Sequence, residues 1–305
     1  FRRRLRLAIL LRIAPPGGAV TALAFAAAIW ACAAPAGAAV SSAVWTIDGL
    51  ADPESAYYDA GSRSLFISNV NGDPAAKDGN GFITKADLNG KVSKLKWVTG
   101  LNGPKGLKAC GGRLYVADID QIVVIKIASG TIERRIGLPG AKFLHDVTSD
   151  KKCQLYVSDL FGSAIYKVAA GEARLWMDGP DLQSPNGLYW LEDKLVIAAW
   201  GLTADGSTQT PGRLLAVDLV RQGVSPLLGP LGHLDGLQRY KDGGLVTDFV
   251  NGTLLQVAAN GKSDVLLHGL EGPADISVVA SQGLLLLPEL KRGRVSAYKL
   301  STLAR

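Results

Sequence analysis

The sequence predicts an all-β protein, a six-bladed β-propeller whose blades are four-stranded antiparallel sheets. Three observations indicate this fold. A unit of about 40 to 50 residues recurs six times along the chain. Its strands are short apolar runs separated by turns that contain Gly or Asn, and no helical periodicity of useful length follows residue 40. Six copies of a four-stranded unit imply a closed ring of sheets.

Each unit begins with a turn rich in Gly, Pro or Asp, followed by an apolar strand, a polar hairpin and a second strand that often ends in Asp. The six copies of this pattern lie at 52–69, 103–118, 144–159, 184–199, 233–248 and 272–287. Strands are predicted at 114–117, 122–127, 155–158, 164–168, 214–217 and 254–257, and turns at 89–90, 111–112, 242–243 and 260–261. Each unit thus supplies the strands of one blade.

Both ends of the repeat region carry a further strand-like run, at 43–47 and at 294–300. Without a shared sheet, the last and first blades would be joined only by side-chain packing, so we predict that these two runs pair. Two units are longer than the others because they contain polar, Gly-rich stretches at 71–81 and 201–212. Such loops gather on the binding face of repeat proteins, and we expect the same here.

The formal net charge of +6 comes almost entirely from five arginines within residues 2–12. Without them the number of Lys and Arg residues falls from 33 to 28, against 27 acidic residues. The folded part of the chain is therefore nearly neutral. This balance argues against a nucleic-acid partner, because such binding depends on a positively charged surface.

The first 38 residues have the pattern of an export signal. An Arg-rich start is followed by an apolar run at 21–34 and by small residues that offer cleavage after Ala38. We expect a signal peptide at 1–38, a propeller domain at 39–305, and export to a bacterial-type periplasm or beyond. A membrane anchor is the alternative, although the run is shorter than the ~20 residues of a spanning helix; lipidation at Cys32 is another. After cleavage we expect a monomer without a membrane partner.

Beyond that segment the chain has two cysteines, Cys110 and Cys153. They lie in corresponding hairpins of neighbouring units, so an oxidising compartment would allow a disulfide between them. We favour the alternative, two free thiols. Neither cysteine has the spacing of a zinc ligand.

One place in the repeat carries polar side chains that the symmetry of a ring would direct toward its axis. The residues assigned to this place are Glu54, Lys105, Asp146, Asn186, Asp235 and Asp275. Carboxylate and amide oxygens are the ligands that a hard divalent cation such as Ca²⁺ prefers. A single Asp or Asn beside Gly more often caps a turn, but Glu54, Asn186 and Asp235 together favour a metal site.

The segments PESAYYD around Glu54, SPNGLYW around Asn186 and HLDGL around Asp235 resemble the senescence marker protein/gluconolactonase family, within the calcium-dependent phosphotriesterase superfamily. The resemblance covers about residues 44 to 300. It implies a six-bladed propeller that holds a catalytic divalent metal through Glu, two Asn and Asp, and that hydrolyses lactones or phosphotriesters. It also implies that these three residues are metal ligands, with Ca²⁺ as the expected ion.

His145 stands where that family has its second metal-binding Asn. Imidazole suits Zn²⁺, Mn²⁺ or Fe better than Ca²⁺, so Zn²⁺ and Mn²⁺ are also candidates. We predict His145 as the fourth ligand or as a catalytic proton carrier; the alternative is that it bonds a neighbouring loop. Asp146 and Asp275 are expected to orient the site around the ligands, and a second ion at Asp275 is a further alternative.

Two further residues complete the predicted site, and a set of repeated carboxylates is predicted to lie outside it. Lys105 and Trp200 are expected to contact the substrate, although Lys105 could instead reach solvent. A residue that recurs in successive blades usually bonds backbone amides, so the strand-ending carboxylates are predicted to be structural. These are Asp118, Asp159 and Asp248.

The function predicted from these residues is an exported, metal-dependent hydrolase of a lactone or related ester, with a small molecule as its substrate. Asp235 would take a proton from water or attack directly, and His145 would assist as a base. The alternative is a non-catalytic propeller that binds a small ligand or a protein through its loop face.

Overall fold

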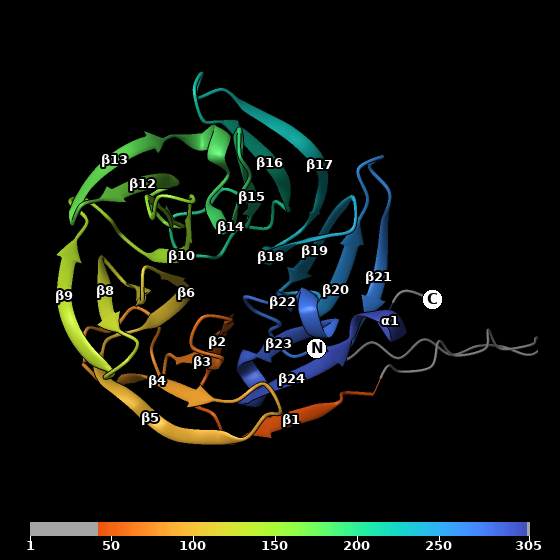
Figure 1. The fold of residues 1–305 in the computed structure, drawn as a ribbon. Helices are drawn as coiled ribbons and strands as arrows, with labels where there is room; N and C mark the ends of the chain where they lie inside the picture. Colours follow the sequence, from red (N-terminus) through yellow and green to blue (C-terminus); the bar gives the residue numbers. More distant parts are fainter. Residues whose placement is uncertain (1–41, 304–305) are drawn as a thin grey trace, which may run out of the picture. The chain divides into compact units, whose positions relative to one another are not determined.

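The computed structural model describes residues 42–303 of the chain. These residues form six four-stranded antiparallel sheets arranged as the blades of a propeller (Figure 1). The fold predicted from the repeat is therefore confirmed. The expected signal peptide at 1–38 lies outside the described residues. Within them, no helix is long and apolar enough to cross a membrane.

The first three blades follow one another along the chain, and each begins with its innermost strand. Blade 1 consists of β2 (Pro53–Asp59), β3 (Ser64–Asn69), β4 (Gly81–Ala86) and β5 (Val92–Leu101). Blade 2 consists of β6 (Pro104–Cys110), β7 (Arg113–Asp118), β8 (Gln121–Lys126) and β9 (Thr131–Gly137). Blade 3 consists of β10 (Leu144–Ser149), β11 (Leu155–Asp159), β12 (Ala164–Ala169) and β13 (Glu172–Asp178).

Blades 4 and 5 repeat this order, whereas blade 6 combines both ends of the chain. Blade 4 consists of β14 (Pro185–Trp190), β15 (Lys194–Ala199), β16 (Gly212–Asp218) and β17 (Val224–Gly232). Blade 5 consists of β18 (Leu234–Tyr240), β19 (Gly243–Asp248), β20 (Thr253–Val257) and β21 (Ser263–Leu267). Blade 6 consists of β22 (Ser277–Val279), β23 (Leu284–Glu289), β24 (Arg294–Lys299) and β1 (Trp45–Asp48). The described helices are short: η1 (Pro180–Leu182), η2 (Ala280–Gln282), η3 (Leu290–Arg292) and α1 (Leu300–Leu303).

The ring closes as predicted, because β1 pairs with β24 along the outer edge of blade 6 (Figure 1). Trp45 lies opposite Ala297, and Ile47 lies opposite Val295. The indole Nε1 of Trp45 also donates to the carbonyl oxygen of Leu88 in blade 1. Strand β1 therefore connects the last blade to the first.

The hydrophobic core consists of packed layers between neighbouring blades rather than one central mass. Six clusters of buried side chains are found among the described residues, one at each junction between adjacent blades. Large residues such as Phe66, Leu114 and Ile165 are fully buried in them. Because apolar side chains fill the spaces between blades, the innermost strands can place polar side chains along the axis.

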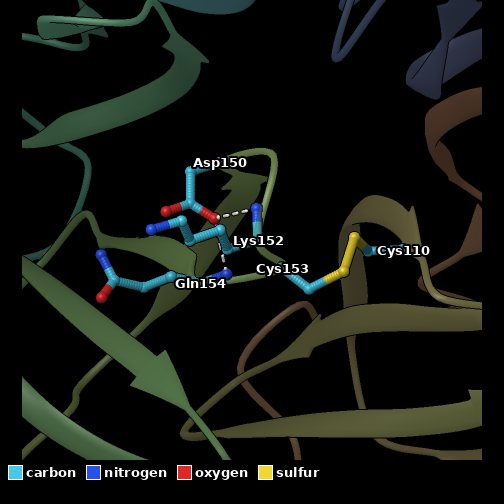
Figure 2. The surroundings of a disulfide bond; sticks show 5 residues. All are labelled: Cys110, Asp150, Lys152, Cys153 and Gln154. Carbon is cyan, nitrogen blue, oxygen red and sulfur yellow. Dashed lines mark hydrogen bonds between the residues drawn. A yellow bond between two sulfur atoms is a disulfide. The ribbon is translucent and has the colours of Figure 1, made fainter.

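A disulfide joins blades 2 and 3, so our preference for two free thiols was wrong. Cys110 at the end of β6 is bonded to Cys153 in the hairpin between β10 and β11, with 5.8 Å between their Cα atoms (Figure 2). The Asp150 carboxylate accepts hydrogen bonds from the backbone amides of Lys152 and Gln154, which shapes the hairpin around Cys153 (Figure 2). The turn thereby presents the thiol to the neighbouring blade.

Candidate metal centre and its pocket

The innermost strands of blades 1 to 5 direct their second residues toward the axis. In blades 1 to 5 the first residue of this strand pairs with the last residue of the second strand, as Pro104 does with Asp118, and a register shift follows. The second residue therefore occupies an equivalent place in each blade. The residues in this place are Glu54, Lys105, His145, Asn186 and Asp235.

Two of the six predicted anchors were assigned one residue too far along the chain. The pairing of Leu144 with Asp159 puts His145, not Asp146, in the equivalent place of blade 3. In blade 6 a bridge between Pro273 and Glu289 puts Ala274 there instead of Asp275. Because successive side chains of a strand point in different directions, Asp146 and Asp275 do not point the same way as the second residues.

Three of the predicted metal ligands meet at one point. Ligand atoms of Glu54, His145 and Asp235 all lie within 4.8 Å of one another. The Nδ1 atom of His145 is 3.5 Å from the Oε1 atom of Glu54. Asn186 is fully buried on β14, the strand between those of His145 and Asp235. The structure therefore brings together the ligand set proposed from the sequence.

The polar atoms of these four side chains are buried without hydrogen-bond partners. They are Oε1 and Oε2 of Glu54, Nδ1 of His145, Oδ1 and Nδ2 of Asn186, and Oδ1 of Asp235. Among the described residues, the hydroxyl of Ser62 is the other buried side-chain atom in this state. Each unpaired buried polar group costs about 1–3 kcal/mol, so six in one place indicate a missing ligand. Two carboxylates, an amide and an imidazole suit a divalent cation.

The charges of the cluster also fit a cation. Burial, followed by the nearby carboxylates of Asp235 and Asp275, raises the pKa of Glu54 well above its ordinary value. Burial and, to a smaller extent, the Asp146 carboxylate also raise the pKa of Asp235 well above its ordinary value. A cation between the two carboxylates would offset both burial and repulsion. Burial lowers the pKa of His145 to about 3, so its imidazole is neutral and able to bind a metal.

Asp146 and Asp275 contact the backbone and side chains next to the ligands. Asp146 accepts hydrogen bonds from the amides of Val147 and Leu188, at 2.6 and 2.7 Å. Asp275 accepts a hydrogen bond of 2.6 Å from the hydroxyl of Ser55, the residue after Glu54. Asp146 therefore connects the strand of His145 to the strand of Asn186, and Asp275 fixes the start of β2. These contacts are consistent with the orienting role expected of both residues.

Glycine allows neighbouring innermost strands to approach one another closely, directly after the second residue of the strand. A Cβ atom on Gly187, the residue after Asn186, would lie 2.0 Å from the carbonyl oxygen of Asp235. One on Gly106 would lie 2.6 Å from the Cα atom of Asp146. Any side chain at these two positions would push the ligand-bearing strands apart.

The repeated strand-ending carboxylates bond backbone amides, as predicted. Asp118 accepts hydrogen bonds from the amides of Asn102 and Gly103, and Asp159 from those of Lys142 and Phe143. Asp248 accepts similar bonds from the amides of His233 and Asn251. Each carboxylate thus holds the turn that leads into its own blade's innermost strand, and so positions the second residue of that strand.

A cavity of about 270 Å³ has Glu54, His145 and Asp235 in its lining. Both long polar loops contribute to its wall, through Gly72 and Pro74 in one and Gly206 in the other. The expectation that these loops gather at the binding face is therefore confirmed.

Lys105 and Trp200 also line the cavity, as predicted. The ammonium of Lys105 does not reach solvent: it donates to the carbonyl oxygens of Pro74 and Gly103, both at 2.9 Å. It also lies 4.1 Å from the centre of the Phe143 ring. The indole of Trp200 donates to the carbonyl oxygen of Gly206.

A ring of apolar side chains in the cavity wall was not predicted from the sequence. In each blade one apolar residue directly follows the second strand, and in five blades it lines the cavity. The five residues are Val70, Leu160, Trp200, Phe249 and Leu290. The signal was present in the repeat, because an apolar residue follows the strand-ending residue in all six copies. Phe143 and Phe161, stacked at 4.3 Å, extend this wall.

No protein-family model matches the chain, and no curated protein sequence is significantly similar to it. Solved structures are similar in fold. A gluconolactonase of Xanthomonas campestris superimposes with a TM-score of 0.64 at 13% identity, covering 84% of this chain and 88% of the gluconolactonase. The chain has the fold of a gluconolactonase. The resemblance expected from the sequence is thereby confirmed in the architecture.

The gluconolactonase fold is shared with a second kind of enzyme. A virginiamycin B lyase of Staphylococcus aureus has a TM-score of 0.58 at 14% identity, covering 80% of this chain and 81% of the lyase. A streptogramin B lyase has a TM-score of 0.56 at 12% identity, covering 83% of this chain and 96% of the lyase. At such identities the likeness establishes the fold, and the activity must be argued from the site.

Proposed function

We propose that this protein is an exported, metal-dependent hydrolase of a lactone or related ester. The observation that carries the proposal is the group of unpartnered buried atoms on Glu54, His145, Asn186 and Asp235. Of these four residues, Glu54, His145 and Asp235 line the cavity. The gluconolactonase fold supports it, because that enzyme's name describes the same reaction class on the same architecture. Export is supported by the disulfide, since disulfides persist in oxidising compartments.

The four side chains of the cluster would hold the cation. The resemblance to the gluconolactonase family favours Ca²⁺, whereas the imidazole of His145 favours Zn²⁺ or Mn²⁺. When bound, such an ion polarises a carbonyl and stabilises the charge that develops on its oxygen.

The protein's own groups supply the proton transfer. The Oδ1 atom of Asp235 is buried without a hydrogen-bond partner. With one lone pair directed at the cation, its other lone pair would accept a proton from water or attack the carbonyl. The imidazole of His145 lines the same cavity and is neutral. Because its pKa is lowered to about 3, it is a weak base, so Asp235 is the preferred proton acceptor. The apolar wall excludes bulk water and strengthens both interactions.

The first test combines metal analysis, thermal melting and turnover. The purified protein is expected to contain a divalent metal, to melt at a lower temperature once stripped, and to recover on addition of Ca²⁺, Zn²⁺ or Mn²⁺. The reloaded protein should open lactones with incorporation of ¹⁸O from labelled water, which distinguishes hydrolysis from the elimination catalysed by a lyase. Absence of both metal and melting shift would favour the alternative, a propeller that only binds a ligand or protein.

Two variants with matched controls locate the activity. Asp235→Asn and Glu54→Gln should each lower metal-dependent turnover by about 10²-fold or more, whereas the exposed Asp264→Asn and Glu172→Gln should not change it. Glu54→Gln should also raise the melting temperature of the stripped protein, because it removes one of two neighbouring buried carboxylates. Full turnover by stripped Glu54→Gln protein would contradict the proposal.

A further inference from the structure

The wall of the cavity differs in chemistry from its floor. The unpartnered polar atoms belong to Glu54, His145 and Asp235 at the axis and to Asn186 beside them. The remaining lining is dominated by apolar side chains, which we name the apolar collar. The collar consists of Val70, Phe143, Leu160, Phe161, Trp200, Phe249 and Leu290. A substrate that reaches the cluster must place the rest of its surface against this collar.

The polar groups that border the collar bond within the protein. The Oδ2 atom of Asp52 accepts the amide of Gly72 at 3.0 Å. Trp200 Nε1 donates to Gly206, and Lys105 donates to two backbone carbonyl groups. Trp200 therefore has no donor left for a substrate, and Lys105 has one N–H left. The second carboxylate oxygen of Asp52 keeps acceptor capacity at the border of the collar.

This division has consequences for a substrate with many hydroxyl groups. A sugar ring could stack on one aromatic face, but its hydroxyls would leave water without finding new partners in the collar, and that costs free energy. A hydrocarbon or aryl group in the same place would gain free energy, because its own surface and that of the collar both leave water. The collar should therefore favour binding of a lactone with an apolar body over a sugar lactone with the same reactive ring.

Resting on the proposed function, we infer that the substrate is a small lactone with an apolar or aryl body rather than a polyhydroxylated sugar lactone. The ester group would face the axial cluster, and the apolar body would contact the collar, above all Trp200 and Phe249, whose rings lie 5.7 Å apart. The cavity of about 270 Å³ is at the lower end of ligand sites, which suits one or two rings.

The test compares two six-membered lactones, dihydrocoumarin and glucono-1,5-lactone, in the metal-loaded protein. The kcat/KM for dihydrocoumarin should exceed that for the sugar lactone by at least about tenfold. Binding of the corresponding lactams, 3,4-dihydroquinolin-2-one and gluconolactam, is measured by calorimetry and does not depend on turnover. The quinolinone should bind more tightly by at least about tenfold.

Substitutions in the collar test whether the collar causes the preference for the apolar ligand. Leu290→Ala and Phe249→Ala should weaken quinolinone binding severalfold and leave gluconolactam binding unchanged. Ile119→Ala is the matched control for Leu290→Ala, because Ile119 occupies the same place in blade 2 but does not line the cavity.

The two proposals fail in different ways. If no lactone is opened with any metal, the proposed hydrolase is wrong, and the lactam affinities still test the collar. Tighter binding of gluconolactam than of the quinolinone would overturn the inference even in an active hydrolase. Collar variants that leave both affinities unchanged would overturn it as well.

Discussion

At the scale of single residues, Lys105 shows how a buried charge serves the pocket indirectly. Its side chain is almost fully buried, and burial lowers its pKa to about 8, so it is still protonated at neutral pH. Its ammonium donates to the carbonyl oxygen of Pro74, which belongs to the long loop between β3 and β4. We therefore interpret Lys105 as a positioning residue that fixes this loop at the cavity; its contact with the substrate stays a prediction.

Lys105→Met, which keeps the length of the side chain, should lower the free energy of unfolding by about 1–3 kcal/mol at pH 7, because two buried carbonyl groups lose their donor. The folded-state pKa of about 8 lies below the unfolded value of about 10.4. Between these values the unfolded chain binds more protons, so the stability of the unsubstituted protein rises with pH.

Denaturant unfolding of both proteins at pH 7 and pH 9.5 measures this difference. The stability advantage of the unsubstituted protein over Lys105→Met should grow by on the order of 1–2 kcal/mol across that range. If the unsubstituted protein and Lys105→Met were equally stable at pH 7, and also equally stable at pH 9.5, the ammonium would not anchor the loop.

At the scale of elements, the innermost strand and its hairpin decide what the sequence could and could not predict. Glu54, Asn186 and Asp235 were assigned correctly because each follows directly on the residue that opens its strand. Asp146 and Asp275 were misassigned because the hairpins after these strands differ in length, and repeat spacing does not fix register to one residue. A one-residue shift changes the direction of a side chain, so the repeat alone did not place His145. The family resemblance suggested it as a ligand, and the strand pairing puts it in the equivalent place.

The disulfide was missed for a related reason. Sequence spacing shows that Cys110 and Cys153 lie in corresponding hairpins, but the distance between neighbouring hairpins depends on how the blades twist. The apolar collar was missed although its pattern is visible, because one apolar residue after a strand is indistinguishable from ordinary packing until the axis is located. Composition and periodicity thus predicted the blades, and contacts between blades required the structure.

Replacement of both cysteines, as Cys110→Ala with Cys153→Ala, should lower the free energy of unfolding by about 2–4 kcal/mol. The bond links residues 43 apart in sequence and so restricts the unfolded chain. Denaturant unfolding of the oxidised protein and of the double variant measures the loss. Reduction should destabilise the oxidised protein to a similar extent and leave the double variant unchanged. A variant as stable as the oxidised protein would show that packing alone holds blades 2 and 3 together.

At the scale of the whole molecule, the candidate metal cluster depends on closure of the ring. Its side chains come from blades 1, 3, 4 and 5, and their separation is set by packing around the full circle. Blade 6 contributes no ligand, but Asp275 joins it to blade 1 beside Glu54. An opening between these two blades would therefore move Glu54 away from the other ligands.

Deletion of residues 39–48 should lower the melting temperature and weaken metal binding together, because β1 is the strand that joins the chain's two ends in one sheet. Within β1, Ile47 is buried in the cluster between blades 6 and 1, whereas Thr46 is exposed. Ile47→Ala should therefore cost about 2–5 kcal/mol, and Thr46→Ala much less.

A chain that begins at residue 39 is the control for the deletion, and calorimetric melting with and without added metal is the measurement. The metal-induced rise in melting temperature should be smaller in Ile47→Ala than in Thr46→Ala, because looser closure leaves Glu54 less well placed. An unchanged melting temperature after the deletion would show that side-chain packing between blades 6 and 1 closes the ring without β1. If Ile47→Ala were destabilised but showed the same metal-induced rise in melting temperature as Thr46→Ala, the geometry of the candidate metal centre would not depend on ring closure.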